Sequence, residues 1–259
     1  MWGSEFAVFG LEFNTFQFFI YLAFLVAGGF FYRESSKIGL RYSQFFVIFM
    51  AVVILAPIGA SLLSAAEFGR RFIEIFQGRS GTTHLGGYLL ALPVILLIAR
   101  LWKIPMLKLL DVIALAWTLG YGVGRLACFF SGDGCYGIPT SSIFGMTFPH
   151  GIVPTSVPVY PTPLFETAYS LIIFGVFYYF LTRKQVHGIP DGRIFFGASS
   201  WMLLSRFVVE FIRTNPRYDG YSLSQWLCMP LIVLYSFLNV RLPLNMAPNP
   251  ELNAIRVST

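Results

Sequence analysis

Long apolar segments alternate with short polar segments along most of the chain. Each apolar segment holds about 20 residues, enough for a helix to cross a hydrocarbon core of ~30 Å. Runs of this length are typical of transmembrane helices. The pattern predicts spans at 16–32, 43–63, 84–101, 109–130, 164–182, 193–212 and 222–241. We therefore expect an all-α polytopic membrane protein with about seven transmembrane helices, forming a single transmembrane domain over residues 1–259.

Composition supports this class of protein. Of the 259 residues, 56% are hydrophobic and only 12% are charged, whereas a soluble domain carries about 25% charged residues. The formal net charge is +6, but the basic residues lie in short clusters between apolar segments. This arrangement indicates membrane topology and does not indicate a nucleic-acid partner.

The basic clusters predict how the chain is oriented. They follow the first, third, fifth and seventh spans, at Arg33, Arg100, Arg183 and Arg241. Because loops rich in Lys and Arg remain in the cytoplasm, we expect the N-terminus outside and the C-terminus in the cytoplasm. Arg70 and Arg71 oppose this assignment, and the segment 67–76 around them is expected to lie as an amphipathic turn on the outer interface.

The longest segment outside the spans is 131–163. It is rich in Gly, Pro, Ser and Thr, a composition typical of loops and turns. We expect it to form a small extracytoplasmic cap of loops and short strands.

The most unusual stretch is 120–137, which joins the fourth span to this cap. It places Arg125 inside an apolar helix, where a charge costs roughly 2.5–3.5 kcal/mol and marks a functional site by default. Glycines at positions 132, 134 and 137 interrupt the helix around Asp133. An arginine in apolar surroundings beside a carboxylate turn is suited to bind an anion such as a phosphate. The alternative is an internal Arg125–Asp133 ion pair that orders the cap, and the two interpretations are compatible.

Cysteine spacing is uninformative by itself. The chain has three cysteines, Cys128, Cys135 and Cys228. They form no CxxC pair, so the spacing does not indicate a zinc or redox site. A disulfide between Cys128 and Cys135 stays open, as does the question whether Cys128 is reactive or merely small.

Two polar residues stand near the starts of predicted spans. His84 opens the third span just before a glycine pair at 86–87, and Glu166 lies near the start of the fifth. A lone histidine at such a place is more simply an interfacial helix cap, but the glycine pair and the Arg125 stretch favour a functional role. Glu166 is either an N-terminal charge favoured by the helix dipole or a buried partner for an arginine.

The sixth span carries three charges, Arg206, Glu210 and Arg213. Residues three and four apart share a helix face, so this stripe is predicted to face the bundle interior and not the lipid. Together with Arg125, the interior then contains more positively charged than negatively charged side chains, unless Glu166 and Asp133 both face it as well. A lipid headgroup phosphate would complete the balance.

The order and spacing of four motifs resemble the bacterial prolipoprotein diacylglyceryl transferases over about 20–240. The motifs are 124–133 (GRLACFFSGD), 144–149 (FGMTFP), 160–166 (YPTPLFE) and 206–213 (RFVVEFIR). The resemblance implies a seven-span, N-outside protein of the bacterial cytoplasmic (inner) membrane.

Enzymes of this family move the diacylglyceryl group of phosphatidylglycerol to the lipobox cysteine of a secreted precursor and release glycerol phosphate. The resemblance implies catalytic roles for Arg125 and Arg206, which would hold the phosphate, and for His84 at the reacting end. It implies substrate-binding or orienting roles for Cys128, Asp133, Gly137, Glu166, Glu210 and Arg213. The expected partners are a phospholipid donor, membrane lipids and a lipobox-containing precursor, with no metal or organic cofactor and no nucleic acid.

Several positions depart from the pattern of the family. Cys128 and Ser131 stand where the family has asparagines, Asp133 stands for a glutamate, and Leu85 separates His84 from the glycine pair. The phosphate-binding residues are kept while residues expected at the acceptor change. We therefore expect either the lipoprotein reaction or a paralogue that uses the same donor with another acceptor. The alternative class is a non-catalytic phospholipid-binding or lipid-transport membrane protein.

Overall fold

The computed structural model describes residues 5–8, 11–69 and 83–242. Within them, seven helices are long and apolar enough to cross a membrane. They are α1 (Thr15–Lys37), α2 (Tyr42–Glu67), α4 (His84–Leu101), α5 (Met106–Ser131), α6 (Thr162–Thr182), α7 (Arg193–Val209, continued by a 3-10 turn at Glu210–Ile212) and α8 (Leu223–Arg241). The predicted all-α polytopic architecture is confirmed, and a helix lies at each of the seven predicted spans, with α1 extending several residues beyond the predicted end.

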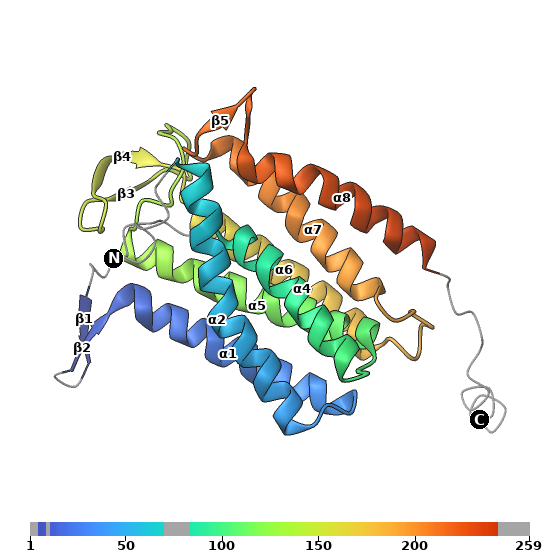
Figure 1. The fold of residues 1–259 in the computed structure, drawn as a ribbon. Helices are drawn as coiled ribbons and strands as arrows, with labels where there is room; N and C mark the ends of the chain where they lie inside the picture. Colours follow the sequence, from blue (N-terminus) through green and yellow to red (C-terminus); the bar gives the residue numbers. More distant parts are fainter. Residues whose placement is uncertain (1–4, 9–10, 70–82, 243–259) are drawn as a thin grey trace, which may run out of the picture.

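Short antiparallel hairpins accompany the helices. They pair β1 (Glu5–Val8) with β2 (Leu11–Asn14), β3 (Met146–Phe148) with β4 (Thr155–Val159), and β5 (Arg217–Tyr218) with β6 (Tyr221–Ser222). Figure 1 shows β3, β4 and β5 gathered at one end of the bundle, where α5 and α7 end and α6 and α8 begin. This end is called the cap end below.

The central helix of the bundle is α5, which contacts α1, α6 and α7. Hydroxyl groups of α6 bind its backbone: Thr167 Oγ1 donates to the Gly122 carbonyl at 3.0 Å and Ser170 Oγ to the Thr118 carbonyl at 2.5 Å. Small residues and interhelical hydrogen bonds of this kind are how transmembrane helices associate closely. The fourth span is thereby held in the protein interior, which explains how it tolerates an arginine.

Glycines bring α2 and α4 into backbone contact. A Cβ atom built on Gly87 would lie 3.1 Å from Ala56 Cα, and one on Gly59 would lie 2.8 Å from Leu90 Cβ. Only glycine allows this approach. The pair at 86–87 therefore has a packing role, and it no longer supports a functional role for His84 by itself.

The cap is joined to the end of α5. Gly132 ends the helix with φ +60°, a left-handed conformation that favours glycine. The amides of Ile152 and Val153 then donate to the carbonyls of Ser131 and Gly132 at 2.9 and 2.8 Å. The short strands predicted within 131–163 are present as β3 and β4, so this prediction is confirmed.

A candidate anion site of buried arginines and carboxylates

Glu166 is the centre of a buried ion cluster at the cap end. It lies near the start of α6 and is fully buried (0% exposed). Its carboxylate pairs with three arginines: Oε2 with Arg125 Nε at 2.9 Å, Oε1 with Arg206 Nη1, and Oε2 with Arg213 Nη1 at 3.5 Å. Of the two interpretations of Glu166 from the sequence, the buried arginine partner is confirmed.

A second carboxylate completes the cluster. Glu210 Oε2 lies 2.7 Å from Arg206 Nη2 and 3.7 Å from Arg213 Nε. The prediction that these three charges share one helix face holds for Arg206 and Glu210. Arg213 is different, because α7 ends at Val209 and Arg213 follows the 3-10 turn in extended backbone (φ −87°, ψ 161°). It still points to the same cluster.

Gly137 supports Arg213 from the cap. The two residues form an isolated antiparallel bridge, and the Ile138 amide donates to the Ile212 carbonyl at 2.9 Å. A Cβ atom on Gly137 would collide with the Ile212 carbonyl oxygen and lie 3.2 Å from Tyr160 Cβ. The structure thus gives Gly137 a close-packing role behind Arg213.

The charges of the cluster do not cancel. Three guanidinium groups meet two carboxylates, and Arg125 and Arg206 are only 7% and 3% exposed. Arg206 Nε and Arg213 Nε are buried and donate no hydrogen bond to any described residue. A buried surplus of cation with unused donors is costly unless an anion completes it. Guanidinium groups suit phosphate best, because their donors match its oxygens in pairs.

His84 lies against this cluster through an aromatic residue. Its ring centroid is 4.1 Å from that of Tyr121, and the Tyr121 hydroxyl accepts a hydrogen bond from Arg125 Nε at 3.1 Å. His84 Nδ1 is buried and forms no hydrogen bond within the part of the chain that the structure describes. The Thr83 side chain does not cap α4. The simple helix-cap interpretation of His84 therefore has no geometric support, while a role beside Arg125 does.

Two tyrosines of the cluster were not anticipated from the sequence. The Tyr169 hydroxyl donates to the Tyr121 hydroxyl at 3.4 Å, and the Arg125 guanidinium carbon lies 5.1 Å from the Tyr121 ring centroid. Tyr121 is four residues before Arg125, so the two share one face of α5. This four-residue spacing was the only sequence signal that Tyr121 lies beside Arg125. Many aromatic residues of the chain have such a spacing to some other residue, so the signal was not distinctive.

Asp133 does not reach the arginines. Its Oδ1 accepts the Cys135 amide at 3.0 Å, and within the described residues it forms no ion pair. The alternative pairing of Arg125 with Asp133 is therefore wrong, because Glu166 occupies that position. Cys128 does reach Arg125, whose Nη1 lies 3.6 Å from Cys128 Sγ. Cys135 Sγ, Cys128 Sγ and a carboxylate oxygen of Asp133 all lie within 4.8 Å of one another.

Glu67 was misplaced by the sequence analysis. It is the last residue of α2 and is fully buried, not part of a surface turn; residues 70–76 of that predicted turn lie outside the described residues. Its carboxylate accepts from Thr83 Oγ1 at 2.8 Å and Ser224 Oγ at 3.3 Å. Asn215 Nδ2 lies 3.4 Å from Glu67 Oε1 and 2.5 Å from Glu210 Oε1. Asn215 thus links Glu67 to Glu210, while no arginine of the cluster pairs with Glu67 within the described residues.

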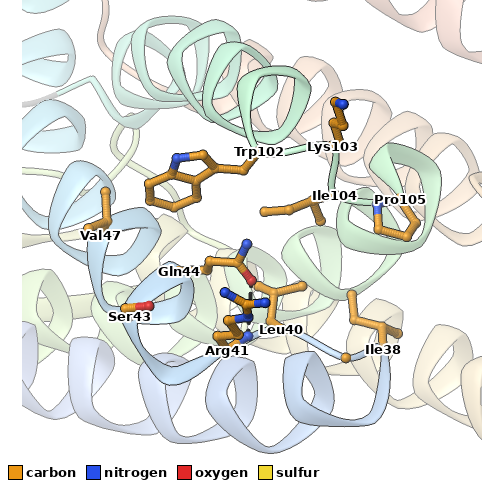
Figure 2. Close-up of a pocket in the computed structure, with 11 residues that line it drawn as sticks. Ile38, Leu40, Arg41, Ser43, Gln44, Val47, Trp102, Lys103, Ile104 and Pro105 are labelled. Carbon is orange, nitrogen blue, oxygen red and sulfur yellow. Dashed lines mark hydrogen bonds between the residues drawn. The ribbon is translucent and has the colours of Figure 1, made fainter.

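A cavity lies elsewhere, between the α1–α2 and α4–α5 connections. It has a volume of about 570 Å³, and its lining includes Arg41, Trp102 and Lys103. Figure 2 shows that it is built from the ends of these helices. None of the site residues predicted from the sequence lines it. The chemistry indicated by the motifs therefore belongs to the cap end and not to this cavity.

The fold and this cluster define a polytopic membrane protein with a buried cluster in which three guanidinium groups meet two carboxylates. A model of the prolipoprotein diacylglyceryl transferase family matches residues 5–241, and the chain belongs to this family. The resemblance inferred from the motifs is thereby confirmed.

Individual relatives agree with this membership. The chain is 32% identical over 180 residues to a phosphatidylglycerol–prolipoprotein diacylglyceryl transferase of Leptospira interrogans, a match that covers 69% of this chain and 51% of the relative. A second relative with this name, from Clostridium perfringens, is 27% identical over 81% of this chain and 82% of its own length. A third, from Clostridium tetani, is 25% identical over 90% and 94%. The match spans about half the length of the Leptospira relative.

Proposed function

We propose that this chain is a membrane-embedded transferase that moves the diacylglyceryl group of phosphatidylglycerol to a cysteine thiol of a lipobox-containing precursor protein. The observation that carries the proposal is the surplus of buried guanidinium donors around Glu166. The chain also belongs to the prolipoprotein diacylglyceryl transferase family. The names of its relatives contain both phosphatidylglycerol and prolipoprotein.

The chemistry of this reaction requires fixed positive charge. A C–S bond forms at the diacylglyceryl carbon, the bond from that carbon to a phosphate oxygen breaks, and glycerol phosphate leaves with one more negative charge. Cations held in place near the leaving oxygen stabilise the transition state without reorganisation. Arg125 and Arg206 are placed for this role, and Glu166 and Glu210 hold their guanidinium groups in position.

The phosphate joins the cluster without displacing Glu166. Arg206 Nε and Arg213 Nε supply donors that no group of the described residues accepts from, and the surplus charge supplies the attraction. The acceptor thiol must also lose its proton. In the proposal His84 accepts it, because its ring lies against the Tyr121–Arg125 pair and its buried Nδ1 forms no hydrogen bond with any described residue.

The proposed setting is the bacterial inner membrane with the N-terminus outside and the C-terminus in the cytoplasm. Basic residues lie at the ends of alternate helices, as in Arg33, Arg100, Arg183 and Arg241, which supports this orientation. The cap end and its cluster then face outward, where a secreted precursor arrives.

The proposal is tested by rescue of a bacterial strain depleted of its own diacylglyceryl transferase. Expression of this chain should restore growth and the diacylglyceryl-modified precursor, measured by mass spectrometry of a reporter lipoprotein. Failure to modify the reporter, with phosphatidylglycerol still consumed and glycerol phosphate released, would replace the precursor by another acceptor. No turnover of phosphatidylglycerol at all would refute the proposal.

The variant His84→Ala distinguishes a transferase from a non-catalytic lipid-binding protein. The variant should lower transfer by about 10²–10⁴-fold and still copurify with phospholipid. If wild-type and His84→Ala cells had the same lipid and lipoprotein products, the non-catalytic phospholipid-binding or transport function would be favoured. His187→Ala is the matched control, since His187 lies in the α6–α7 connection at the opposite end.

A further inference from the structure

A pair of thiols lies at the edge of the arginine cluster. Cys128 is buried in the last turn of α5, and Cys135 is partly exposed in the cap. Their sulfur atoms and a carboxylate oxygen of Asp133 lie within 4.8 Å of one another, and both cysteines are free. Cys228, by contrast, is buried between α7 and α8 in an apolar cluster. The pair is therefore set apart from the remaining cysteine by its position at the site.

The backbone between the two cysteines holds them together. Gly132 and Gly134 have φ values of +60° and +88°, which reverse the chain after α5. The Asp133 carboxylate accepts the Cys135 amide at 3.0 Å. The Cys135 carbonyl accepts from Thr162 Oγ1 at 2.6 Å and from Arg213 Nη1 at 3.2 Å. Hydrogen bonds to its amide and its carbonyl thus hold the backbone of Cys135 beside the end of α5.

The local charges favour thiolate chemistry over metal binding. Arg125 Nη1 lies 3.6 Å from Cys128 Sγ, and Arg213 binds the backbone at Cys135. A hydrogen bond from the Cys128 thiol lowers the pKa of Cys135, as do both arginines, against the opposing effects of burial and Asp133. Nearby arginines activate a cysteine as a nucleophile, whereas they repel a divalent cation.

We infer that Cys128 and Cys135 form a reversible disulfide that controls the arginine cluster, and that they react with a small-molecule or protein disulfide as oxidant. The Cys135 thiolate attacks one sulfur of the oxidant R–S–S–R, giving a mixed disulfide and one R–S⁻. The Cys128 thiolate then attacks Cys135 Sγ, which forms the internal disulfide and releases the second R–S⁻. Two protons leave the protein thiols and are taken up by the two released R–S⁻ groups, so the oxidant is reduced to two R–SH.

Formation of the disulfide removes hydrogen-bond acceptors from two of the three arginines. The sulfur atoms must approach to about 2.05 Å, so Cys135 and its carbonyl move toward α5. Arg213 Nη1 loses an acceptor held at 3.2 Å. Cys128 Sγ, now in a disulfide, no longer offers Arg125 a thiol acceptor. Oxidation is therefore expected to weaken binding of a phosphate headgroup. This consequence rests on the proposed function, whereas formation of the disulfide does not.

The first test measures the disulfide alone. Purified protein in detergent is treated with oxidised glutathione, alkylated with iodoacetamide and digested, and the peptides of 128 and 135 are analysed by mass spectrometry. We expect one linked peptide pair, reversed by dithiothreitol, in the wild type and in Cys228→Ala. The inference is overturned if both thiols alkylate fully after oxidation, or if Zn²⁺ at micromolar concentration binds stoichiometrically and protects them.

The second test measures the consequence. Phosphatidylglycerol binding is titrated with the oxidised and reduced forms of the wild type and of Cys135→Ser. Oxidation should weaken binding by about tenfold in the wild type, the effect of one lost hydrogen bond to a charged group, and should not change Cys135→Ser. A linked pair with equal affinity in both redox states would overturn the control of the cluster. Absence of phosphatidylglycerol binding in every form would instead refute the proposed function.

Discussion

Two ion clusters, each centred on a buried carboxylate, lie at opposite ends of α5, and they are built on different principles. Near its start, Asp111 accepts from Lys184 Nζ at 2.5 Å, from the Gly192 amide at 3.0 Å and from the Phe195 amide at 2.9 Å. Lys184 also pairs with Asp191 at 2.7 Å. Here carboxylates outnumber the cation, and protein donors fill the Asp111 carboxylate.

At the other end of α5, the balance is reversed. Three arginines meet Glu166 and Glu210, and donors on Arg206 and Arg213 remain unused. The Asp111 cluster fastens the start of α5 to the chain that enters α7, so its charges serve packing. The Glu166 cluster keeps a surplus of positive charge, which under the proposed function binds the phosphate of the lipid. The difference teaches that partner counting, and not burial alone, separates a structural ion cluster from a binding site.

The largest expected effect is a loss of stability when the charge of Glu166, the centre of the cap-end cluster, is removed. Glu166→Gln leaves three buried guanidinium groups with only Glu210 as a charged partner. Breaking buried ion pairs from one side costs about 3–5 kcal/mol, and we expect a loss of unfolding free energy in this range, measured by denaturant unfolding in detergent micelles.

Glu34→Gln is the matched control for this change. Glu34 pairs with Lys37 and Arg33, whose side chains are 53% and 67% exposed, and exposed partners contribute about 1 kcal/mol or less. Equal destabilisation by both variants would remove the distinction between the cluster and an ordinary peripheral ion pair.

The next effect concerns activity and not stability. Arg125→Ala removes the surplus cation and leaves Glu166 paired with Arg206 and Arg213, so the two remaining arginines balance the two carboxylates. We expect transfer from phosphatidylglycerol to fall by about 10²–10³-fold, as for loss of a fixed donor to a transition state, with little change in the amount of folded protein. Arg33→Ala, on an exposed helix end, should leave turnover unchanged. Full turnover by Arg125→Ala would show that the surplus charge is not used in catalysis.

A smaller effect is expected from a substitution at the start of α5, where stability should fall and lipid binding should not. Asp111→Asn removes the charge that faces Lys184 and turns an amide donor toward backbone N–H groups. The expected cost is about 2–3 kcal/mol of unfolding free energy. Phosphatidylglycerol affinity should stay unchanged at a temperature where the variant is folded, measured by titration of the purified protein. Lost affinity with full stability would contradict the division of roles between the two clusters.

The sequence predicted the spans and most of the cap-end site for a physical reason. Apolar runs and intramembrane charges are strong local signals, so Arg125, Arg206 and Glu210 could be found without contacts. Their partners could not all be found, because the choice between Glu166 and Asp133 depends on how α5, α6 and the cap meet. Glu67 was misplaced for the same reason, since its donors come from Thr83, Asn215 and Ser224.

The smallest expected effect is a pH dependence that belongs to the Asp111 cluster alone. Burial tends to lower the pKa of Lys184, but Asp111 and Asp191 outweigh it, so the pKa of this ammonium group is raised above 10.5. A cation whose pKa is raised on folding contributes stability that is complete below the unfolded pKa and is lost as pH rises through the folded value. The unfolding temperature should therefore fall by a few degrees more in the wild type than in Lys184→Met as pH rises above about 10.5. The arginines of the other cluster remain charged throughout this range, so a difference of equal size in Arg125→Ala would show that the two clusters do not differ as their partner counts indicate.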